Sequence, residues 1–341
     1  ELADGRRLPY DRLALATGTR VRRLTVPGAD LPAVRYLRTL DDALAIRERL
    51  ATAQRVVVIG GGFIGLETAA ILAKRGPAVT VLETAPRLLP RAGGDVLGRF
   101  LHAAHERAGV RVVVGARVTA IRASGEGGSG NAADVVCADG SVHAADLVLA
   151  GIGIVPNDEL AVAAGLACDD GILVDEHART SDPAIVAFGD CARAPNAFLG
   201  SVVRLETVHN AVEQAKVAAA TLAGRDAPYR QVPWVWSDQF GYRVQLVGDC
   251  GGADVVLRGD PASGRYTAFH YDGDALRGAC AINRPAEFGA ARRLLTLGLP
   301  LRREEAASSS FDLATRLPPR RRPGFERGWP REEARVAARS R

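Results

Sequence analysis

The sequence lacks methionine altogether and is poor in aromatic residues, which make up 5% of its 341 positions. It also lacks a long apolar run. The most apolar stretch, residues 56–72, is rich in glycine and contains Glu67, whereas a membrane-spanning helix needs about 20 consecutive apolar residues. The first residues show neither a signal-peptide nor a transit-peptide pattern. We therefore expect a cytoplasmic protein without membrane contact, and note that the sequence does not start at an initiator residue.

Cysteine is scarce, with five residues at wide and irregular spacings. The sequence contains no CxxC or CxxxxC pair, so zinc ligation, iron–sulfur ligation and a vicinal redox disulfide are poorly supported. No metal site is expected. An odd number of cysteines without a secretory signal is typical of reduced, mostly buried thiols, and Cys191 is interpreted as a small packed residue.

Positive charge is concentrated in one segment. Residues 315–341 hold nine arginines and three glutamates, so the net charge of +5 leaves −1 for residues 1–314. A nucleic-acid-binding protein needs basic residues gathered on a folded face, and nucleic acid is therefore not an expected partner. The tail is rich in proline and arginine after Leu317, which predicts disorder there.

The most informative segment is a strand, a glycine loop and a helix in direct succession. Residues 55–59 are β-branched apart from Arg55, as in a buried parallel strand, and a helix through residue 73 follows the loop. In such a unit Gly60 permits the tight turn, Gly62 lets a diphosphate approach the backbone, and Gly65 lets the helix pack close to the strand.

The helix is expected to begin within this loop, at Phe63 and Ile64. The free N–H groups and the positive dipole end of a helix N-terminus favour phosphate. A second strand, residues 78–82, ends on Glu83, which is placed to bind the adenosine ribose hydroxyls. Strand, loop, helix and acidic strand end together predict dinucleotide binding.

Glu83 favours NAD over NADP, because a carboxylate repels a 2′-phosphate. Arg87 lies four residues further on and is able in principle to reach such a phosphate. NADP therefore stays open as the alternative to NAD.

Other elements surround this unit. A short strand at residues 13–16 ends on Thr17-Gly18, and a helix at residues 41–53 has Asp41 placed to cap it. The same domain continues through a helix at 96–108 and strands near 110–114, 117–123, 134–138 and 147–150. Residues 125–131 are predicted to be a flexible hairpin loop.

The motifs occur in an order that is more specific than any one of them. They are Ala16-Thr17-Gly18, the GxGxxGxE loop from Gly60 to Glu67, the return Gly151–Asn157 that includes Gly153, and the segment Thr180–Asp190. In this combination the chain resembles the flavoprotein pyridine nucleotide–disulfide oxidoreductase superfamily, in which a nicotinamide domain is inserted into an FAD domain. The resemblance implies that Gly189-Asp190 places its carboxylate on the FAD ribityl chain, and that Thr17-Gly18 lies against FAD.

Within that superfamily the chain looks most like the ferredoxin reductases that serve oxygenase and cytochrome systems. The supporting segments are Arg204–Lys216, Val232–Phe240, whose Trp234-Val-Trp236-Ser-Asp is a typical domain opening, and Gln245–Gly248. The C-terminal domain is expected to form strands near 242–247, 254–257, 266–271 and 276–282 and a helix near 286–297.

The implied fold is α/β: two Rossmann-like domains, with the FAD domain incomplete and the NAD domain inserted, and a C-terminal α+β reductase domain. The expected segments are a first FAD-domain remnant at 1–40, the NAD domain at 41–152, a second FAD-domain segment at 153–228, the reductase domain at 229–314 and a basic tail at 315–341. Because the first strand and FAD phosphate loop of the family do not precede Thr17, we expect an N-terminally truncated chain that holds NAD better than FAD.

The resemblance also implies an activity. NADH delivers a hydride to FAD, and the reduced flavin passes single electrons to a [2Fe–2S] ferredoxin, so that the flavin carries the chemistry. Glu67 would orient the nicotinamide carboxamide and Trp236 would face the isoalloxazine. Thr207 and Val208 begin a helix whose N-terminus favours negative charge on the reduced flavin, and Arg20 is a further candidate flavin contact. His209 is interpreted as an ordinary helix residue.

Two alternatives remain open at this level. One is another NADH-dependent reductase of the superfamily, of the rubredoxin, nitrite or disulfide type. The other is a non-enzymatic NAD-binding redox sensor. If the partner is an acidic ferredoxin, its docking surface should be basic, and the candidate residues are Arg243, Arg284, Arg292 and Arg293.

Overall fold

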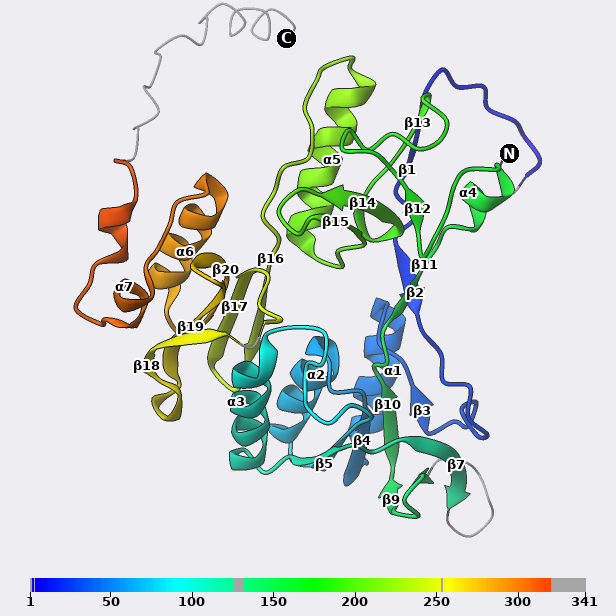
Figure 1. Cartoon of the computed structure of the whole chain (residues 1–341). Coiled ribbons are helices and arrows are strands. Elements are labelled where there is room, and N and C mark those ends of the chain that lie inside the picture. Colours follow the sequence, from blue (N-terminus) through cyan, green and yellow to red (C-terminus); the bar gives the residue numbers. More distant parts are fainter. Residues whose placement is uncertain (1, 3, 125–131, 253, 320–341) are drawn as a thin grey trace, which may run out of the picture.

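The computed structural model describes residues 2, 4–124, 132–252 and 254–319. These residues form three bodies: a domain around α1–α3, a second domain around α5, and a C-terminal domain around α6 (Figure 1). The predicted loop at 125–131 and nearly all of the predicted disordered tail lie outside the described residues. No helix within the described ranges is both long and apolar enough to cross a membrane.

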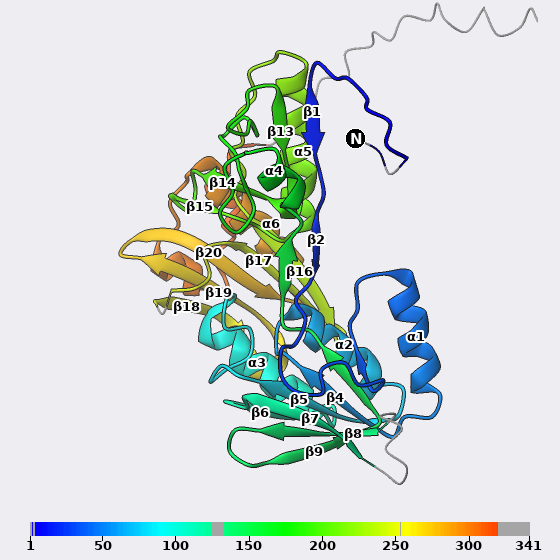
Figure 2. The same cartoon turned by 90° about the vertical axis from the view of Figure 1, so that its right-hand side faces the viewer.

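The first domain is built on a five-stranded parallel sheet with the order β3-β10-β4-β5-β6. In that order its strands are Val34–Arg35, Leu147–Ala150, Arg55–Ile59, Ala78–Glu83 and Arg111–Val114. One face is covered by helices α1 (Leu40–Leu50), α2 (Phe63–Ala73) and α3 (Gly94–Arg107). The other face is covered by an antiparallel meander of β7 (Val118–Ser124), β8 (Ala132–Cys137) and β9 (Val142–Ala145), as Figure 2 shows.

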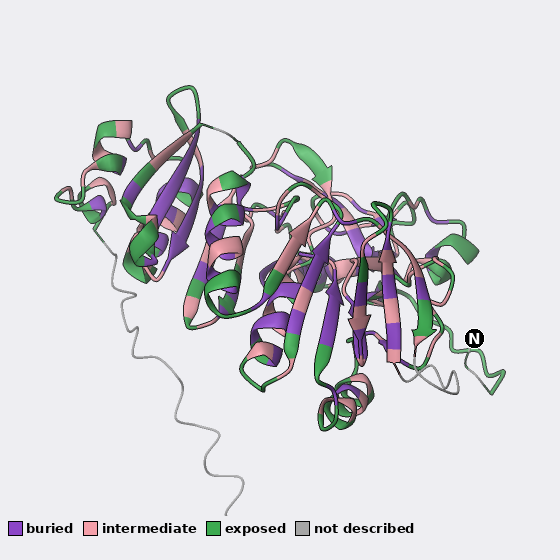
Figure 3. Ribbon diagram, turned by 90° about the horizontal axis from the view of Figure 1, so that it is seen from below, coloured by how far each residue is buried: buried purple, intermediate pink, exposed green. Residues whose placement is uncertain are grey.

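The β-branched run in β4 explains this three-layer arrangement. Successive side chains of a strand point to opposite faces, and Val56 and Val58 pack with the helices while Val57 and Ile59 pack with the meander. All four side chains are at most 5% exposed. A strand covered on both faces must be apolar on both faces, and Figure 3 shows the resulting buried stripe along the sheet.

The second domain is assembled from two separate stretches of the chain. Strand β1 (Leu13–Leu15) pairs in parallel with β13 (Ile185–Ala187), and β2 (Thr19–Val21) pairs antiparallel with β11 (Ile154–Pro156). The chain thus leaves this domain through β2, forms the first domain, and returns through β11. The remaining elements are α4 (Glu159–Ala163), β12 (Ile172–Leu173), η1 (Gly189–Cys191), β14 (Ala192–Asn196), β15 (Ser201–Val203) and α5 (Val208–Leu222). The predicted insertion of one Rossmann-like domain into another is confirmed.

The C-terminal domain is a five-stranded antiparallel sheet with the order β16-β17-β20-β19-β18. In that order its strands are Trp234–Gln239, Tyr242–Gly248, Ala275–Ile282, Arg265–Asp272 and Val255–Asp260. Helix α6 (Pro285–Leu297) covers one face, where Phe269 is buried, and the other face packs Tyr266 against Phe100 of α3, with ring centroids 5.5 Å apart. The predicted α+β domain is confirmed, and it rests directly on the helices of the first domain.

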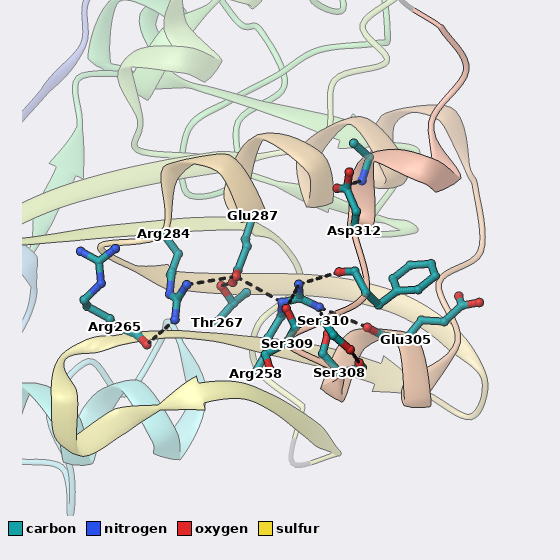
Figure 4. A network of polar contacts seen from close by, with 12 residues as sticks. Arg258, Arg265, Thr267, Arg284, Glu287, Glu305, Ser308, Ser309, Ser310 and Asp312 are labelled. Carbon is teal, nitrogen blue, oxygen red and sulfur yellow. Dashed lines mark hydrogen bonds and ion pairs between the residues drawn. The ribbon is translucent and has the colours of Figure 1, made fainter.

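The end of this domain is held by one buried cation, Arg258 on β18. Its Nε donates to Glu287 of α6 over 3.1 Å, and its terminal nitrogens donate to backbone carbonyls of Glu305, Ser308, Ser309 and Phe311 (Figure 4). The second oxygen of Glu287 accepts from Thr267 over 2.5 Å. This network fixes α7 (Arg303–Ala307) and the loop that leads to η3 (Leu313–Arg316).

Two local expectations need correction. Helix α1 is capped by Thr39, whose side chain accepts from the Asp42 N–H while Asp42 accepts from the Thr39 N–H, so Asp41 is not the cap. This reciprocal capping box satisfies two free donors at once. Strand β9 was not expected, because Val142–Ala145 is short and is held in place by its antiparallel pairing with β8.

Candidate functional site

A cavity with a volume of about 580 Å³ lies where the three domains meet. Its walls come from α2 and the loop before it, from the β5–α3 loop, from the β10–β11 connection, from the start of α5 and from β16. The sequence-predicted residues that line it are Gly62, Phe63, Ile64, Gly65, Glu67, Gly153, Asp190, Thr207, Val208 and Trp236. Folding therefore brings ten predicted residues, from all three domains, to one cavity.

The glycine loop has the geometry of an anion site. Gly60 has φ +110°, and a Cβ there would collide with the carbonyl oxygen of Gly151. A Cβ on Gly65 would collide with the carbonyl oxygen of Gly60, so this residue allows α2 to pack closely on the loop. A Cβ on Gly62 would meet no atom within 4 Å, so the backbone there is open to a ligand. The first N–H groups of α2 have no acceptor within the helix and favour a phosphate.

Glu83 is buried beside this loop and does not line the cavity. One carboxylate oxygen accepts from the Gly61 N–H over 2.6 Å, and the other accepts from the Ala85 N–H over 2.7 Å. The side chain thus ties the glycine loop to the end of β5. A carboxylate has about four acceptor positions, so room for ribose hydroxyls remains, and that role stays a prediction.

The Arg87 side chain stabilises the loop between β5 and α3. Its guanidinium donates to the carbonyls of Leu89 over 2.8 Å and Pro90 over 3.1 Å, and it pairs with Asp95 over 3.1 Å. The donors that would bind a 2′-phosphate are therefore engaged by the protein itself. Sequence reasoning missed Arg91, which lines the cavity from the same loop.

Glu67 links the first domain to the C-terminal domain. Its Oε1 accepts from the Ser237 hydroxyl over 2.5 Å, and Ser237 Oγ accepts from the Gln239 side-chain amide over 2.9 Å. Burial raises the pKa of the Glu67 carboxyl, the Ser237 hydrogen bond opposes this rise, and the charge of Asp238 adds to it. Ser237 and Gln239 are each 1% exposed. Nothing in the local sequence marked either residue as a partner of Glu67.

Trp236 belongs to an aromatic cluster that reaches from the cavity to α6. The ring of Trp234 lies 5.4 Å from that of Trp236, 5.4 Å from His209 and 5.7 Å from Phe288. The guanidinium of Arg292 lies 4.8 Å above the Trp234 ring. Trp236 is 42% exposed, so part of its ring is available to a ligand in the cavity. His209 lies on α5 as expected and is buried against Trp234.

The opposite wall presents Asp190 and the N-terminus of α5. Gly189 has φ +78°, its N–H donates to Gln214 over 2.8 Å, and it turns the chain so that Asp190 lines the cavity. Burial raises the pKa of the Asp190 carboxyl, opposed by Arg38 and Arg204 and increased by Glu206. Thr207 caps α5 by accepting from the Asn210 N–H over 3.1 Å, and Val208 is the first helical residue. The predicted helix start at these two residues is confirmed.

Gly60, Glu83 and Gly189, described above, lie outside the lining of the cavity, and so do Thr17, Gly18 and Arg20. The Thr17 hydroxyl donates to the Asn157 carbonyl over 2.5 Å, and the Asn157 N–H donates to the Gly18 carbonyl over 2.9 Å. Arg20 donates to Asn157 over 2.9 Å and pairs with Glu159 over 2.6 Å. These contacts join β2 to β11, and a flavin contact by Thr17, Gly18 or Arg20 stays a prediction.

The residues present fit both a dinucleotide and a flavin. The open backbone at Gly62 and the start of α2 are suited to bind a diphosphate. The Asp190 carboxylate accepts no hydrogen bond within the described ranges, so it is free to accept from the hydroxyls of a polyhydroxyl chain. The first turn of α5 fits a ring edge that becomes negative. Among the described residues no group of acidic, histidine and cysteine side chains is arranged to hold a metal ion, and no cysteine lines the cavity. Cys191 is packed in the core, in line with its interpretation.

The fold and the cavity define a protein of the two-nucleotide flavoprotein class, with one Rossmann-like domain inserted into another and a sheet domain closing the site. Comparison with known families agrees: residues 1–215 match the pyridine nucleotide-disulphide oxidoreductase family, and residues 234–317 match its reductase C-terminal domain. The chain belongs to the pyridine nucleotide-disulphide oxidoreductase family, which uses FAD and NAD(H).

Several similar proteins carry the names of reductases. Rhodocoxin reductase of Rhodococcus erythropolis is 45% identical over 92% of this chain and 73% of its own length. Putidaredoxin reductase of Pseudomonas putida is 44% identical over 88% of this chain and 72% of its own length. A rubredoxin–NAD(+) reductase of Pseudomonas putida is 39% identical over 84% and 74%.

Solved structures give the same picture. The ferredoxin reductase of the CYP199A2 system from Rhodopseudomonas palustris matches with a TM-score of 0.88 at 43% identity, over 92% of this chain and 77% of its own. The covalent putidaredoxin reductase–putidaredoxin complex matches with a TM-score of 0.87 at 42% identity, over 92% and 76%.

Proposed function

We propose that this protein is an NADH-dependent flavoprotein reductase that passes electrons to a [2Fe–2S] ferredoxin. The observation that carries the proposal is the single cavity in which α2 and Glu67 face Asp190, the start of α5 and Trp236. A dinucleotide bound at the glycine loop and a flavin bound at Asp190 would therefore meet in one cavity. The names of the relatives support the choice of acceptor.

The chemistry belongs to the cofactors: FAD, when bound, would supply the capacity to take a hydride from NADH and to release electrons one at a time. The chain binds and orients. The start of α2 holds the diphosphate, the Glu67 carboxylate accepts from the nicotinamide carboxamide, and Asp190 accepts from ribityl hydroxyls. The N–H groups at Thr207 and Val208 favour negative charge at the flavin edge. Trp236 covers the ring and limits the access of water to it.

We further propose NADH rather than NADPH as the donor, because Glu83 is buried beside the loop and the guanidinium of Arg87 is engaged. The protein is expected to work in the cytoplasm, since all five cysteines are free thiols, as in a reducing compartment.

The test is anaerobic stopped-flow reduction of the purified protein, with FAD in the buffer, followed by transfer to a purified ferredoxin. Loss of the visible flavin absorbance on mixing with NADH and subsequent reduction of ferredoxin are expected. A kcat/KM for NADPH above that for NADH would overturn the donor assignment. Flavin reduction without onward transfer would favour a redox sensor.

Rubredoxin is the second acceptor to test, since one relative carries that name. The same experiment with rubredoxin in place of ferredoxin separates the two assignments. A faster rate with rubredoxin at equal concentration would replace the ferredoxin proposal.

A further inference from the structure

A buried chain of side chains connects the C-terminal domain to the cavity. Gln239 and Ser237 lie on β16, and Glu67 lies on α2, 170 residues away in the sequence from Ser237. The Gln239 amide donates to Ser237 Oγ over 2.9 Å, and the Ser237 hydroxyl donates to Glu67 Oε1 over 2.5 Å. Because Gln239 occupies one acceptor position of the serine oxygen, the hydroxyl proton is directed toward the carboxylate.

The buried polar pair Ser237 and Gln239 lowers the stability of the fold, so it calls for a role at the Glu67 carboxylate. Ser237 and Gln239 are each 1% exposed, and no partner is present for the Gln239 Oε1 atom within the described residues. A buried polar group with an unmade hydrogen bond destabilises the fold, so an apolar pair at these two positions would make the interface more stable. The polar pair is explained if it sets the orientation and charge of the Glu67 carboxylate.

The surroundings of Glu67 are otherwise unfavourable to its charge. Helix α2 carries no other ionisable side chain. On β16, the exposed Asp238 adds a negative charge, and across the cavity Asp190 and Glu206 are also acidic. Arg91 lines the cavity from the β5–α3 loop and Arg38 from the chain before α1. Ser237 is the hydrogen-bond donor that the structure shows on this carboxylate.

We propose that Ser237, supported by Gln239, is a positioning residue that keeps the Glu67 carboxylate ionised and aimed at the nicotinamide, so that the C-terminal domain completes the NADH site. This inference rests on the proposed function. Hydrogen bonding to the charged form favours that form. Without Ser237, burial and Asp238 raise the pKa of Glu67 further, and a protonated carboxyl is a weaker acceptor for the carboxamide.

The experiment measures NADH binding to the whole protein by quenching of tryptophan fluorescence across a series of pH values. In Ser237→Ala, the Kd for NADH is expected to rise about tenfold at neutral pH, the loss typical of one hydrogen bond to a charged group. The pH at which binding weakens on acidification should move upward. Gln239→Leu removes only the donor that supports Ser237. It should move this pH upward too, but less than Ser237→Ala does.

Two controls separate positioning from general damage. Thr267→Val removes the same kind of hydroxyl–carboxylate bond, to Glu287, in the same sheet but outside the cavity lining, and should leave the NADH profile unchanged. In a Glu67→Gln background, Ser237→Ala should change the Kd less than twofold, because Ser237 acts through the carboxylate.

An unchanged pH profile in both Ser237→Ala and Gln239→Leu would overturn the proposal, as would an equal shift in Thr267→Val. Ser237→Ala losing the same affinity with Gln at position 67 would assign Ser237 a purely structural role. Failure of the unmodified protein to reduce ferredoxin while it still binds NADH would count against the proposed function alone.

Discussion

At the residue scale, the side chains with altered acidity that line the cavity are two carboxyls, Glu67 and Asp190. Burial raises the pKa of each. Such shifts gather where a site needs a charge that the fold itself disfavours. Asp190 has no hydrogen bond to its carboxylate within the described chain, and its charge is offset only by Arg38 and Arg204 at longer range.

Asp190→Asn is expected to stabilise the flavin-free protein at neutral pH. The folded-state pKa of Asp190 lies above its unfolded value, so the folded state loses stability as pH rises from the unfolded pKa through the folded pKa. Asparagine removes that loss. The Tm of the variant should exceed that of the parent at neutral pH, and the difference should vanish below the ordinary aspartate pKa. FAD binding should weaken in the same variant.

The check is thermal unfolding of both proteins over a pH series without added FAD. A Tm difference that stays constant over the whole series would contradict the electrostatic origin. Unchanged FAD affinity would remove Asp190 from the flavin site.

At the scale of the elements, two local devices hold the site. Helix α2 packs against the glycine loop because Gly65 has no side chain, and its first turn stays open because Gly62 has none. The C-terminal loop is held by the single guanidinium of Arg258. In the glycine loop, Gly62 acts in ligand binding and Gly65 acts in folding. The Arg258 contacts act in folding.

Substitution of the two glycines should separate binding from stability. In Gly62→Ala the new methyl group points into open space, so the Tm should be kept while the Kd for NADH rises at least about tenfold. In Gly65→Ala the methyl group collides with the Gly60 carbonyl, and stability should fall by about 1–3 kcal/mol. Denaturant unfolding and NADH titration of both variants give the two readouts. A large loss of stability in Gly62→Ala would contradict this assignment.

Arg258→Met should destabilise the C-terminal domain by about 3–5 kcal/mol. The buried Glu287 loses its direct ion pair and keeps the more distant, one-third exposed Arg284, and the backbone carbonyls that Arg258 binds lose their donor. The double variant with Glu287→Gln should recover part of that loss, since no unpaired charge remains. Denaturant unfolding of the parent, the single and the double variant measures both effects. Equal stability of the single and double variants would show that the carbonyl contacts, rather than the ion pair, carry the effect.

At the scale of the whole molecule, the three domains meet at one cavity, and the aromatic cluster leads from it to α6. The four arginines predicted to dock ferredoxin differ in the partners of their guanidinium groups. Arg243 pairs with Asp238 over 3.5 Å, Arg284 lies 3.6 Å from Glu287, and Arg293 donates to the Pro318 carbonyl over 3.2 Å. Arg292 alone of the four stacks on Trp234, next to Trp236. We therefore propose Arg292 as the one of these four residues that contacts an acidic ferredoxin.

Arg292→Glu is expected to raise the KM for ferredoxin roughly tenfold at low ionic strength and to weaken the salt dependence of the rate, because rim charges act mainly on association. Reduction of a small artificial acceptor by NADH should not change. Arg293→Glu, next to it on α6, is the matched control and should have a smaller effect. Equal effects of the two reversals would contradict a role for the Trp234 edge.

Much of the fold was predictable from local pattern. The β-branched run of β4, the glycine loop, α2 and the strand pattern of the C-terminal sheet all follow from neighbouring residues. Helix caps and short strands were less predictable: the Thr39 cap replaces the expected Asp41, and β9 was missed. In both cases the deciding contact is a specific hydrogen-bond partner that periodicity does not reveal.

By itself, local sequence pattern determined the strand–loop–helix unit that binds a dinucleotide and the cavity residues of its loop, because glycines, strand ends and helix starts act within a few positions of one another. The resemblance to the reductase family, and not local pattern, supplied the second nucleotide-binding domain and six further cavity residues: Glu67, Gly153, Asp190, Thr207, Val208 and Trp236. Only the tertiary structure decided what those residues do to each other. It engages Arg87 in its own loop, sets Glu83 against Gly61, and joins Glu67 to Ser237 across 170 residues. Such contacts depend on which surfaces pack together, and that information lies in no single stretch of the chain.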